Sequence, residues 1–425
     1  MQTDVFGPAV RAVARTHGMP RLRYVYVPQP VMGKSPAELR AYIDGDDPNT
    51  GRPVMTEVID ALTRPLDAAD RAVISYDRGT SRFLEPDTKK NLRVFFEEQK
   101  WTDFLPIVLP TEKRVEAMLA ATRHAPDEIV GRMRPTSTRE AWQYTVEKVA
   151  VNAVMAGAEP ETFPVILALA ASQVSARGST TSSTANMVVV NGPIRHEIGM
   201  NCGIGAMGPF NRANATIGRA YGLLSMNLQG GSEPGMTYLG SQGNAYMYSS
   251  IPFAENEERS PWAPFHVQQG FAADESVASI WSGVRATAYC LGLRETYWRT
   301  HVRNMLRGLH PYLYPTLVLD PITAQQFVDR GGFDTVDKLI QWVHENATMP
   351  AEVYWDYQLV QNYVYPRALN GEEPYASWLA ASPDELIRFY PKERINVVVV
   401  GGETNGYWRI MAGSYNKSVS IDDWR

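Results

Sequence analysis

Cysteine is nearly absent from this chain of 425 residues, which contains only Cys202 and Cys290. Two cysteines are too few for a secreted disulfide framework or for a cysteine-rich zinc or iron–sulfur site. The first twenty residues lack the apolar core of a signal peptide, and no apolar run has the length of a transmembrane helix. We therefore expect a cytoplasmic protein with no membrane partner.

An excess of basic residues is also missing. The 41 lysines and arginines are scattered and are outnumbered by 46 acidic residues, which gives a net charge of -5. Binding nucleic-acid phosphates needs a concentrated positive field, so we expect no nucleic-acid partner. The composition is that of an ordinary globular protein. We expect a small-molecule substrate and a homo-oligomer, for which a dimer is the commonest form.

Several enzyme motifs are missing, among them G-x-S-x-G, Walker A, C-x-x-C and the protein-kinase set. Gly203, Gly205 and Gly208 match G-x-G-x-x-G, but no strand precedes them and no acidic residue follows about 20 residues later. No repeat of fixed period is visible. We predict no cofactor and leave a metal ion open.

Strand-like and helix-like segments alternate along the chain. Apolar spacing predicts helices over 111–118, 145–157, 322–332 and 335–347 and strands over 72–75, 187–190, 316–320 and 395–400. The segment 163–173 fits a buried strand or a helix, and the segment 276–309 is predicted to be helical. This alternation predicts an α/β fold with mixed or parallel sheets and helices on both faces, arranged as two closely packed α/β lobes.

We divide the chain into three regions on this basis. Residues 1–108 form an N-terminal α/β region, and 301–425 form a C-terminal α/β region. Residues 109–300 form a central region rich in glycine and asparagine, where we expect the active site.

Candidate substrate-binding residues gather in this central region. A helix after Pro209 would place Arg212 and Arg219 on one face, and two guanidinium groups can grip a carboxylate. Its amino-terminal end would offer positive potential. Hydroxyl groups before the strand over 187–190 add hydrogen-bond donors. The complete expected set is Asn152, Ser179, Thr180, Thr181, Asn191, Asn211, Arg212, Asn214 and Arg219.

Lys148 is the first candidate for acid–base chemistry. It lies four residues before Asn152, on one face of an otherwise apolar helix. Desolvation there would lower the pKa of its ammonium group, so that it acts as a base or as an electrostatic stabiliser. Glu147 or His196 would complete the proton transfer.

Cys202 is the candidate nucleophile, since a thiol near a histidine or a helix amino terminus becomes reactive when its pKa falls. The alternative is that Cys202 is a small buried apolar residue. Glu255, Glu257 and His266 form a fallback metal set, in a segment that also contains Glu258, but no known ligand spacing appears, and a charged surface loop is the better explanation.

Several blocks of the sequence resemble a bacterial family described beside the UGSC-motif (seleno)proteins. They include YTVEKVAVNAVMAGAEPETFPVILAL, VVVNGPI, GPFNRANATIGRA, AENEERSPWAPFH and PTLVLDPITAQQFVDRGGFDTVDKLIQWVHE, so the similarity covers roughly residues 105 to 410. The defining tetrad of that family implies thiol or selenol redox chemistry. Here the corresponding residues are Arg78, Gly79, Thr80 and Ser81, with no cysteine, which excludes a dithiol mechanism and leaves a pocket for non-redox chemistry.

The sequence therefore predicts a cytoplasmic enzyme that acts on a small polar or carboxylate-bearing metabolite by cofactor-independent hydrolysis or elimination. Two alternatives stay open. One is a redox enzyme that uses Cys202 as its thiol together with a partner protein. The other is a non-catalytic ligand-binding subunit.

Overall fold

The computed structural model describes residues 1–425 apart from 17, 18, 20, 32, 69, 72–80, 133–142, 179–181, 230–233 and 235–237. The strand expected at 72–75, the residues 78–80 of the tetrad look-alike and the expected substrate-binding residues Ser179, Thr180 and Thr181 lie outside the described residues.

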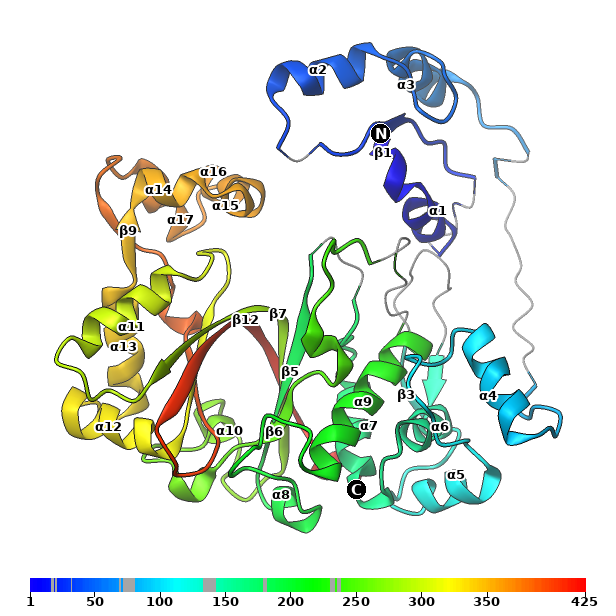
Figure 1. The fold of residues 1–425 in the computed structure, drawn as a ribbon. Helices are drawn as coiled ribbons and strands as arrows, with labels where there is room; N and C mark the ends of the chain where they lie inside the picture. The colour runs from blue at the N-terminus through cyan, green and yellow to red at the C-terminus, as the bar shows by residue number, and fades with distance from the viewer. Residues whose placement is uncertain are drawn as a thin grey trace.

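A six-stranded sheet lies at the centre of the molecule, with strand order β11-β8-β12-β7-β5-β6 (Figure 1). The pairs β5–β6 and β8–β11 are parallel, and the other three pairings are antiparallel. Its strands are β5 (Ala185–Asn191), β6 (Pro252–Ala254), β7 (Val277–Leu291), β8 (Pro315–Leu319), β11 (Asn396–Val399) and β12 (Tyr407–Ser420). The predicted α/β fold with a mixed sheet is confirmed.

The strand order has the same pattern when read from either edge. Each half consists of a short parallel pair followed by one long antiparallel strand, namely β6, β5 and β7 in one half and β11, β8 and β12 in the other. The two halves join through the pairing of β7 with β12, which runs from Val277 to Leu291 on one strand. The two halves of the sheet therefore follow an approximate twofold pattern, although the sequence shows no matching repeat.

The sheet curls until its two edge strands meet. The backbone N–H of Asn256, just after β6, donates to the carbonyl of Val399 on β11 at 2.8 Å, and its side-chain amide donates to the carbonyl of Gly401 at 2.9 Å. All six strands contribute to one enclosed core, so the sheet is barrel-like. That core includes Met187, Val189, Phe253, Trp281, Val284, Val318, Val398 and Met411.

Helices cover the outside of this sheet from both sides (Figure 1). One group packs on the outer faces of β5 and β7 and consists of α6 (Val146–Ala156), α7 (Phe163–Ala171) and α9 (Arg212–Asn227). The other packs on β8, β11 and β12 and includes α11 (Trp298–Arg307), α12 (Pro321–Gly331) and α13 (Val336–Asn346).

Local signals explain where these helices begin and end. Thr145 caps the amino terminus of α6, and Gly157 ends it in the left-handed conformation with φ 78°. Asp320 caps α12 by accepting a hydrogen bond from the N–H of Thr323 at 2.7 Å. The segment 163–173, which fits two structures by periodicity, forms helix α7, and eight of its nine residues are buried.

The prediction of a helical stretch over 276–309 is wrong for its first half. Residues Val277–Leu291 form strand β7, and only Trp298–Arg307 form a helix. Ala278 and Ile280 pack outward against the helices, while Trp281 packs into the enclosed core. Because both faces of the strand are buried over 277–281, the alternation of apolar and polar residues that marks a surface strand is missing there.

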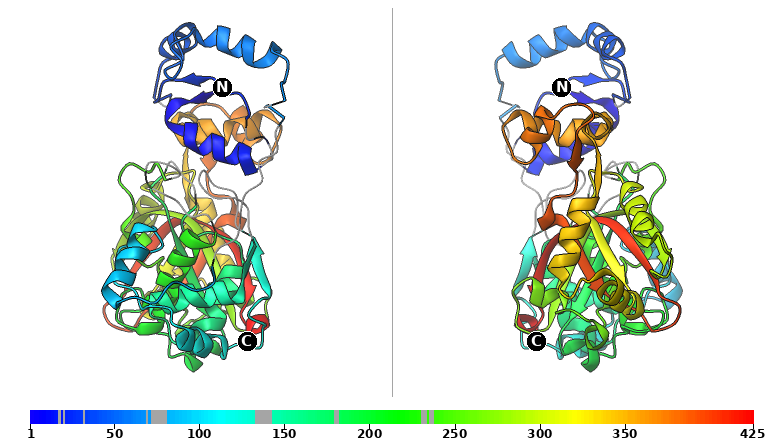
Figure 2. Two further views of the ribbon diagram at one scale, coloured as in Figure 1. Left: turned by 90° about the vertical axis from the view of Figure 1, so that its right-hand side faces the viewer. Right: turned by 90° about the vertical axis from the view of Figure 1, so that its left-hand side faces the viewer.

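Two further parts lie at the same end of the molecule (Figures 1 and 2). The N-terminal part has a small core of its own around Val25, Val27 and Val54. It contains β1 (Gln2–Thr3), α1 (Gly7–Thr16), β2 (Tyr26–Val27), α2 (Pro36–Asp44) and α3 (Val54–Thr63). The other part contains α14 (Ala351–Asp356), α15 (Gln358–Tyr363), α16 (Tyr365–Leu369) and α17 (Tyr375–Ala380).

The remaining elements connect or flank these parts. They are α4 (Lys89–Glu98), α5 (Glu112–Leu119), β3 (Ile129–Arg132), β4 (Gln143–Thr145), α8 (Ile194–Glu197), α10 (Phe265–Gln268), β9 (Thr348–Pro350) and β10 (Leu386–Arg388). None of the helices in the described part of the chain combines the length and apolar character of a membrane-spanning segment.

We predict that Gly218→Ala lowers the stability of the protein. A Cβ atom at Gly218, inside α9, would overlap the backbone carbonyl of Ser249. Overpacking against a fixed backbone costs about 1–3 kcal/mol, enough to lower the Tm by several degrees. The matched control is Gly222→Ala in the same helix, where the nearest atom is Nη2 of Arg177 at 3.3 Å. Equal Tm values for the two variants, measured by calorimetry, would contradict this prediction.

Candidate active site

The candidate site lies where the parallel strands β5 and β6 end. Ligands of α/β proteins bind beyond the carboxyl ends of parallel strands. β5 ends at Asn191, and Glu255 follows the last residue of β6. The loop around Cys202 lies against the same edge, because its carbonyl accepts a hydrogen bond from the N–H of Gly401, beyond β11, at 2.8 Å.

Glu255 is the buried centre of this region, with only 1% of its surface exposed. Its Oε2 accepts hydrogen bonds from the side-chain amide of Asn191 at 2.6 Å and from the N–H of Phe265 at 2.8 Å. Its Oε1 accepts one from the N–H of Val399 at 3.3 Å, across the junction of the two edge strands. Burial raises the pKa of Glu255 to about 7, although these hydrogen bonds oppose the shift.

Arg195, on α8, is the buried cation that balances the neighbouring carboxylates. Its guanidinium lies 3.0 Å from Glu257 and 2.8 Å from Glu258, and 4% of its side chain is exposed. It also donates to the backbone carbonyls of Gly192 and Glu255. All three guanidinium nitrogens of Arg195 thus donate hydrogen bonds, and these bonds connect the loop after β6 to the end of β5.

His196 extends this network to the surface. Its Nε2 lies 2.9 Å from Oε1 of Glu258, and 65% of its side chain is exposed. The pKa of Glu258 is lowered to about 2, first by its hydrogen bond with Arg195 and also by the bond with His196. Glu258 is therefore ionised at neutral pH and orients the imidazole ring, whose Nδ1 makes no hydrogen bond with the described residues.

Cys202 is half-buried, and burial raises the pKa of its thiol, an effect that the charge of Arg195 opposes. A nucleophilic cysteine needs the opposite shift, because the thiolate is the reactive form. The environment of Cys202 in the structure therefore counts against the redox alternative.

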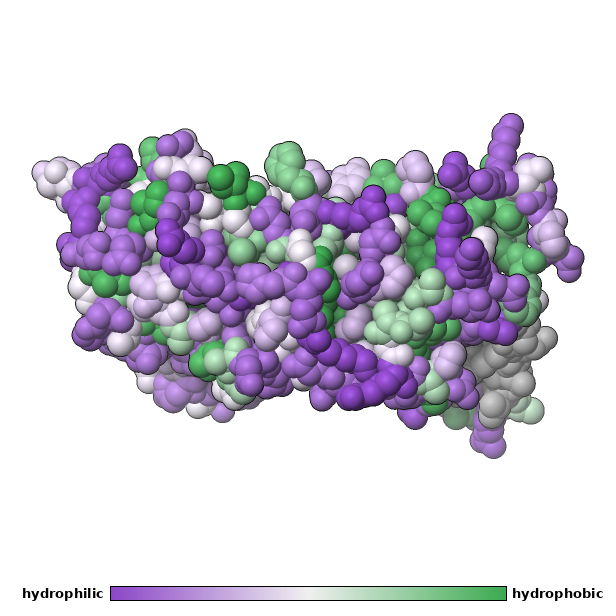
Figure 3. Space-filling view, turned by 90° about the horizontal axis from the view of Figure 1, so that it is seen from below, coloured by the Kyte–Doolittle hydropathy of each residue, from purple (hydrophilic) through white to green (hydrophobic). Residues whose placement is uncertain are grey.

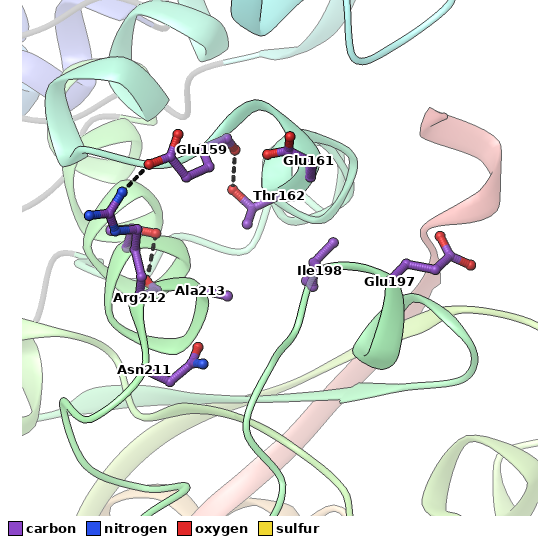
Figure 4. A pocket seen from close by; sticks show the side chains of 9 residues that line it. Glu159, Glu161, Thr162, Glu197, Ile198, Asn211, Arg212 and Ala213 are labelled. Carbon is purple, nitrogen blue, oxygen red and sulfur yellow. Dashed lines mark hydrogen bonds and ion pairs between the residues drawn. The ribbon is translucent and has the colours of Figure 1, made fainter.

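A cleft of about 270 Å³ lies beside α8, between the amino ends of α7 and α9 (Figure 4). Arg212, at the start of α9, reaches up to form an ion pair with Glu159. Asn211 caps α9, and its side-chain amide donates to the carbonyl of Gly199 at 2.9 Å. The lining residues are Glu159, Glu161, Thr162, Glu197, Ile198, Asn211, Arg212, Ala213 and Thr216.

Asn214 and Arg219, also on α9, have partners within the protein. The Asn214 side chain, 1% exposed, accepts from the N–H of Asn201 at 2.8 Å and donates to the carbonyls of Asn201 and Ala206. Arg219 forms two hydrogen bonds of 2.9 Å with Asp103. These contacts hold the Cys202 loop and the segment before α5 in place, so they account for both residues without a substrate.

Glu147, Lys148 and Asn152 lie on α6, away from the Arg195 network. Glu147 forms an ion pair with Arg82. The Asn152 side chain donates to the carbonyl of Lys148 at 2.9 Å and accepts from Asn227 at 2.8 Å. The structure therefore divides the predicted catalytic residues between two places, and only His196 and Cys202 lie near the ends of β5 and β6.

The fallback metal set does not come together as a cation site. No group of three or more His, Cys, Asp or Glu side chains suited to a metal ion is found among the described residues. Glu255 and Glu257 instead accept hydrogen bonds from Asn191. His266 is fully buried, and its Nε2 lies 3.4 Å from the carbonyl of Ala273.

Arg195 was absent from the predicted site, and Glu258 was named only beside the candidate metal ligands. The sequence offers one signal for the pairing of these two residues: the segment IRHE contains an arginine, and the segment ENEER contains three glutamates. A buried arginine needs carboxylate partners, so these two segments are expected to meet. Comparisons of the chain with protein-family models, with curated proteins and with solved structures find no match. The interpretation of the site therefore depends on its geometry.

We predict that Glu255→Gln changes how stability depends on pH. The folded carboxyl group keeps its proton up to about pH 7, whereas an unfolded chain releases it near its ordinary pKa of 4.5. Between these values the folded state binds more protons, so this group's contribution to stability falls as pH rises. The wild type should lose roughly 3 kcal/mol relative to the variant across this window.

Thermal unfolding of both proteins between pH 4.5 and 8 tests this expectation. The difference in Tm between variant and wild type should grow in favour of the variant as pH rises. Glu393→Gln, at an exposed position, is the control and should follow the wild-type curve. Parallel curves for Glu255→Gln and the wild type would show that Glu255 does not titrate in this range.

Proposed function

We propose that this protein is an enzyme that acts on a small polar or carboxylate-bearing metabolite by cofactor-independent hydrolysis or elimination, with His196 as the general base. The observation that carries this proposal is the chain of contacts from buried Arg195 through Glu258 to exposed His196. A histidine oriented by an ionised carboxylate is the arrangement that general acid–base catalysis requires.

The chemistry follows from Nδ1 of His196, which has no hydrogen-bond partner in the described part of the chain. In hydrolysis, Nδ1 takes a proton from water as the water oxygen bonds to the electrophilic carbon. The same proton then passes to the leaving group as its bond to that carbon breaks. In elimination, Nδ1 takes a proton from the carbon next to a carboxylate, and the leaving group departs from the adjacent carbon. In both reactions Glu258 stabilises the imidazolium ion, because its lowered pKa keeps it anionic.

The cleft beside α8 supports a small polar substrate. Its volume of about 270 Å³ lies just below the usual range for small-molecule sites, which suits only a small substrate. Arg212, beside its ion pair with Glu159, and Asn211, beside its bond to Gly199, keep further N–H groups for a carboxylate or hydroxyl group (Figure 4). The underside of the molecule in Figure 1, where α8 lies, is mainly hydrophilic, with apolar side chains in separate small groups (Figure 3).

We further propose a cytoplasmic location and a homodimer. Both cysteines are free, which suits a reducing compartment. Membership of the family beside the UGSC-motif proteins is a proposal of the same kind. Native mass spectrometry of the purified chain measures the oligomeric state directly.

We predict that His196→Gln lowers kcat at least 100-fold, since a general base contributes 10²–10⁴ in rate. Turnover is followed by proton NMR on a set of carboxylate-bearing esters, amides and hydroxy acids. The control is His124→Gln, because His124 also pairs with a glutamate at 2.9 Å, while its other contacts are with Thr122, Asp423 and Trp424 rather than with Arg195 or Glu258. Full activity in His196→Gln would remove His196 from the mechanism.

Glu258→Gln adds a readout that a structural role would not change. Loss of the anion leaves the imidazolium ion without its partner in the transition state, so kcat should fall while KM changes little. A fall in activity that only follows the fraction of folded protein would assign Glu258 to folding alone. Binding without turnover by the wild type would support a ligand-binding subunit instead.

A further inference from the structure

Arg285 lies on β7 at the opposite end of the sheet from His196. The residue before it, Val284, pairs with Ala185 at the start of β5, whereas Asn191 at the end of β5 pairs with Val277. Gly283 adopts φ 75°, and the β7–β12 pairing shifts register next to Arg285, between Ala412 and Ser414. Bulges of this kind redirect side chains near functional sites.

The Arg285 guanidinium is half-buried and makes no hydrogen bond or ion pair with the described part of the chain. Its Nε and Nη1 atoms are buried without a hydrogen-bond partner among the described residues, and no ion pair involves it there. By contrast, buried Arg195 and partly buried Arg219 each contact carboxylates. Leaving a buried cation unpaired is unfavourable, so native proteins rarely keep such a group unless something binds it.

Aromatic and polar groups surround this cation. Burial lowers the pKa of Arg285, and the negative charge that Tyr312 and Tyr363 carry once they ionise opposes this shift. The rings of Tyr312 and Tyr363 stack with centroids 5.3 Å apart. Tyr363 belongs to α15, so the group joins the barrel to the helices α14–α17.

His310 adds a further donor. Its Nδ1 accepts a hydrogen bond from the N–H of Tyr312 at 3.1 Å, which places the proton of the neutral ring on Nε2. Burial and the charge of Arg285 both lower the pKa of His310, so the ring is neutral at pH 7. The ring of Tyr357 packs edge-on against it at 4.9 Å.

We propose that Arg285, His310 and Tyr312 bind the carboxylate of a small organic acid with a flat apolar body, between the barrel and α15. A guanidinium pairs with a carboxylate through two parallel hydrogen bonds. One cation with neutral donors matches a single negative charge better than a doubly charged phosphate, and the stacked tyrosines suit a flat ring. This site is separate from the proposed acid–base site, because the two lie at opposite ends of β5.

Benzoate is the probe, and calorimetric titration of the full chain at pH 7 is the measurement. We expect benzoate to bind, and Arg285→Gln to weaken its binding at least tenfold. Benzamide has the same shape without the charge and should bind at least tenfold more weakly. The control is Arg409→Gln, at a half-buried arginine on the neighbouring strand β12, which should bind benzoate as the wild type does.

Three results would overturn the proposal. They are equal benzoate binding by the wild type and Arg285→Gln, an equal loss in Arg409→Gln, or inorganic phosphate binding as tightly as benzoate. The stability of Arg285→Met separates binding from folding. Because this variant removes an unpaired buried charge, its Tm should equal or exceed that of the wild type without benzoate, and added benzoate should no longer raise it. A lower Tm without benzoate would assign Arg285 a structural role.

Discussion

The pairing of β7 with β12 is the interaction on which the rest of this structure depends. These two long strands join halves that each contain only a short parallel pair, and neither pair forms a sheet of useful size by itself. Register shifts in the β7–β12 ladder increase its twist. The twist turns the two halves toward each other, so that the ends of β6 and β11 meet and enclose a core to which all six strands contribute.

Closure of the sheet explains why so many charged groups lie at one place. The end of β6 carries three glutamates, and closure buries the first of them against the backbone of β11. A buried carboxyl group beside two others is unfavourable unless it is neutral or paired. Both solutions are present here, since the pKa of Glu255 is raised and Arg195 binds Glu257 and Glu258. His196 follows Arg195 in the chain, and it therefore pairs with a carboxylate, that of Glu258, which Arg195 already holds in position.

Arg195 and Arg285, at opposite ends of β5 and β7, differ in whether their hydrogen-bond donors serve the stability of the fold or are left for a ligand. Each guanidinium nitrogen of Arg195 has a hydrogen-bond partner within the protein, and its role is to hold the network that orients His196. Arg285 has two guanidinium nitrogens without a partner among the described residues, which is unfavourable for folding alone and favourable for binding an anion. The two arginines of α9 resemble Arg195 in this respect. Arg212 and Arg219 carry the charge expected for substrate binding, but they already pair with Glu159 and Asp103.

The sequence by itself determined the α/β class, the helices α5, α6, α9, α12 and α13, and the strands β5, β8 and β11, because caps, glycines and apolar spacing act over a few residues. It also indicated that His196, Cys202 and the glutamates after β6 were candidates. Only the tertiary structure decided that β7 is a strand, that Glu255 is buried, and which carboxylate each arginine binds. Arg195 and Glu258 are 63 residues apart, and Arg219 and Asp103 are 116 apart. Such pairings arise from the closure of the sheet and the packing of helices on it, which local spacing does not encode.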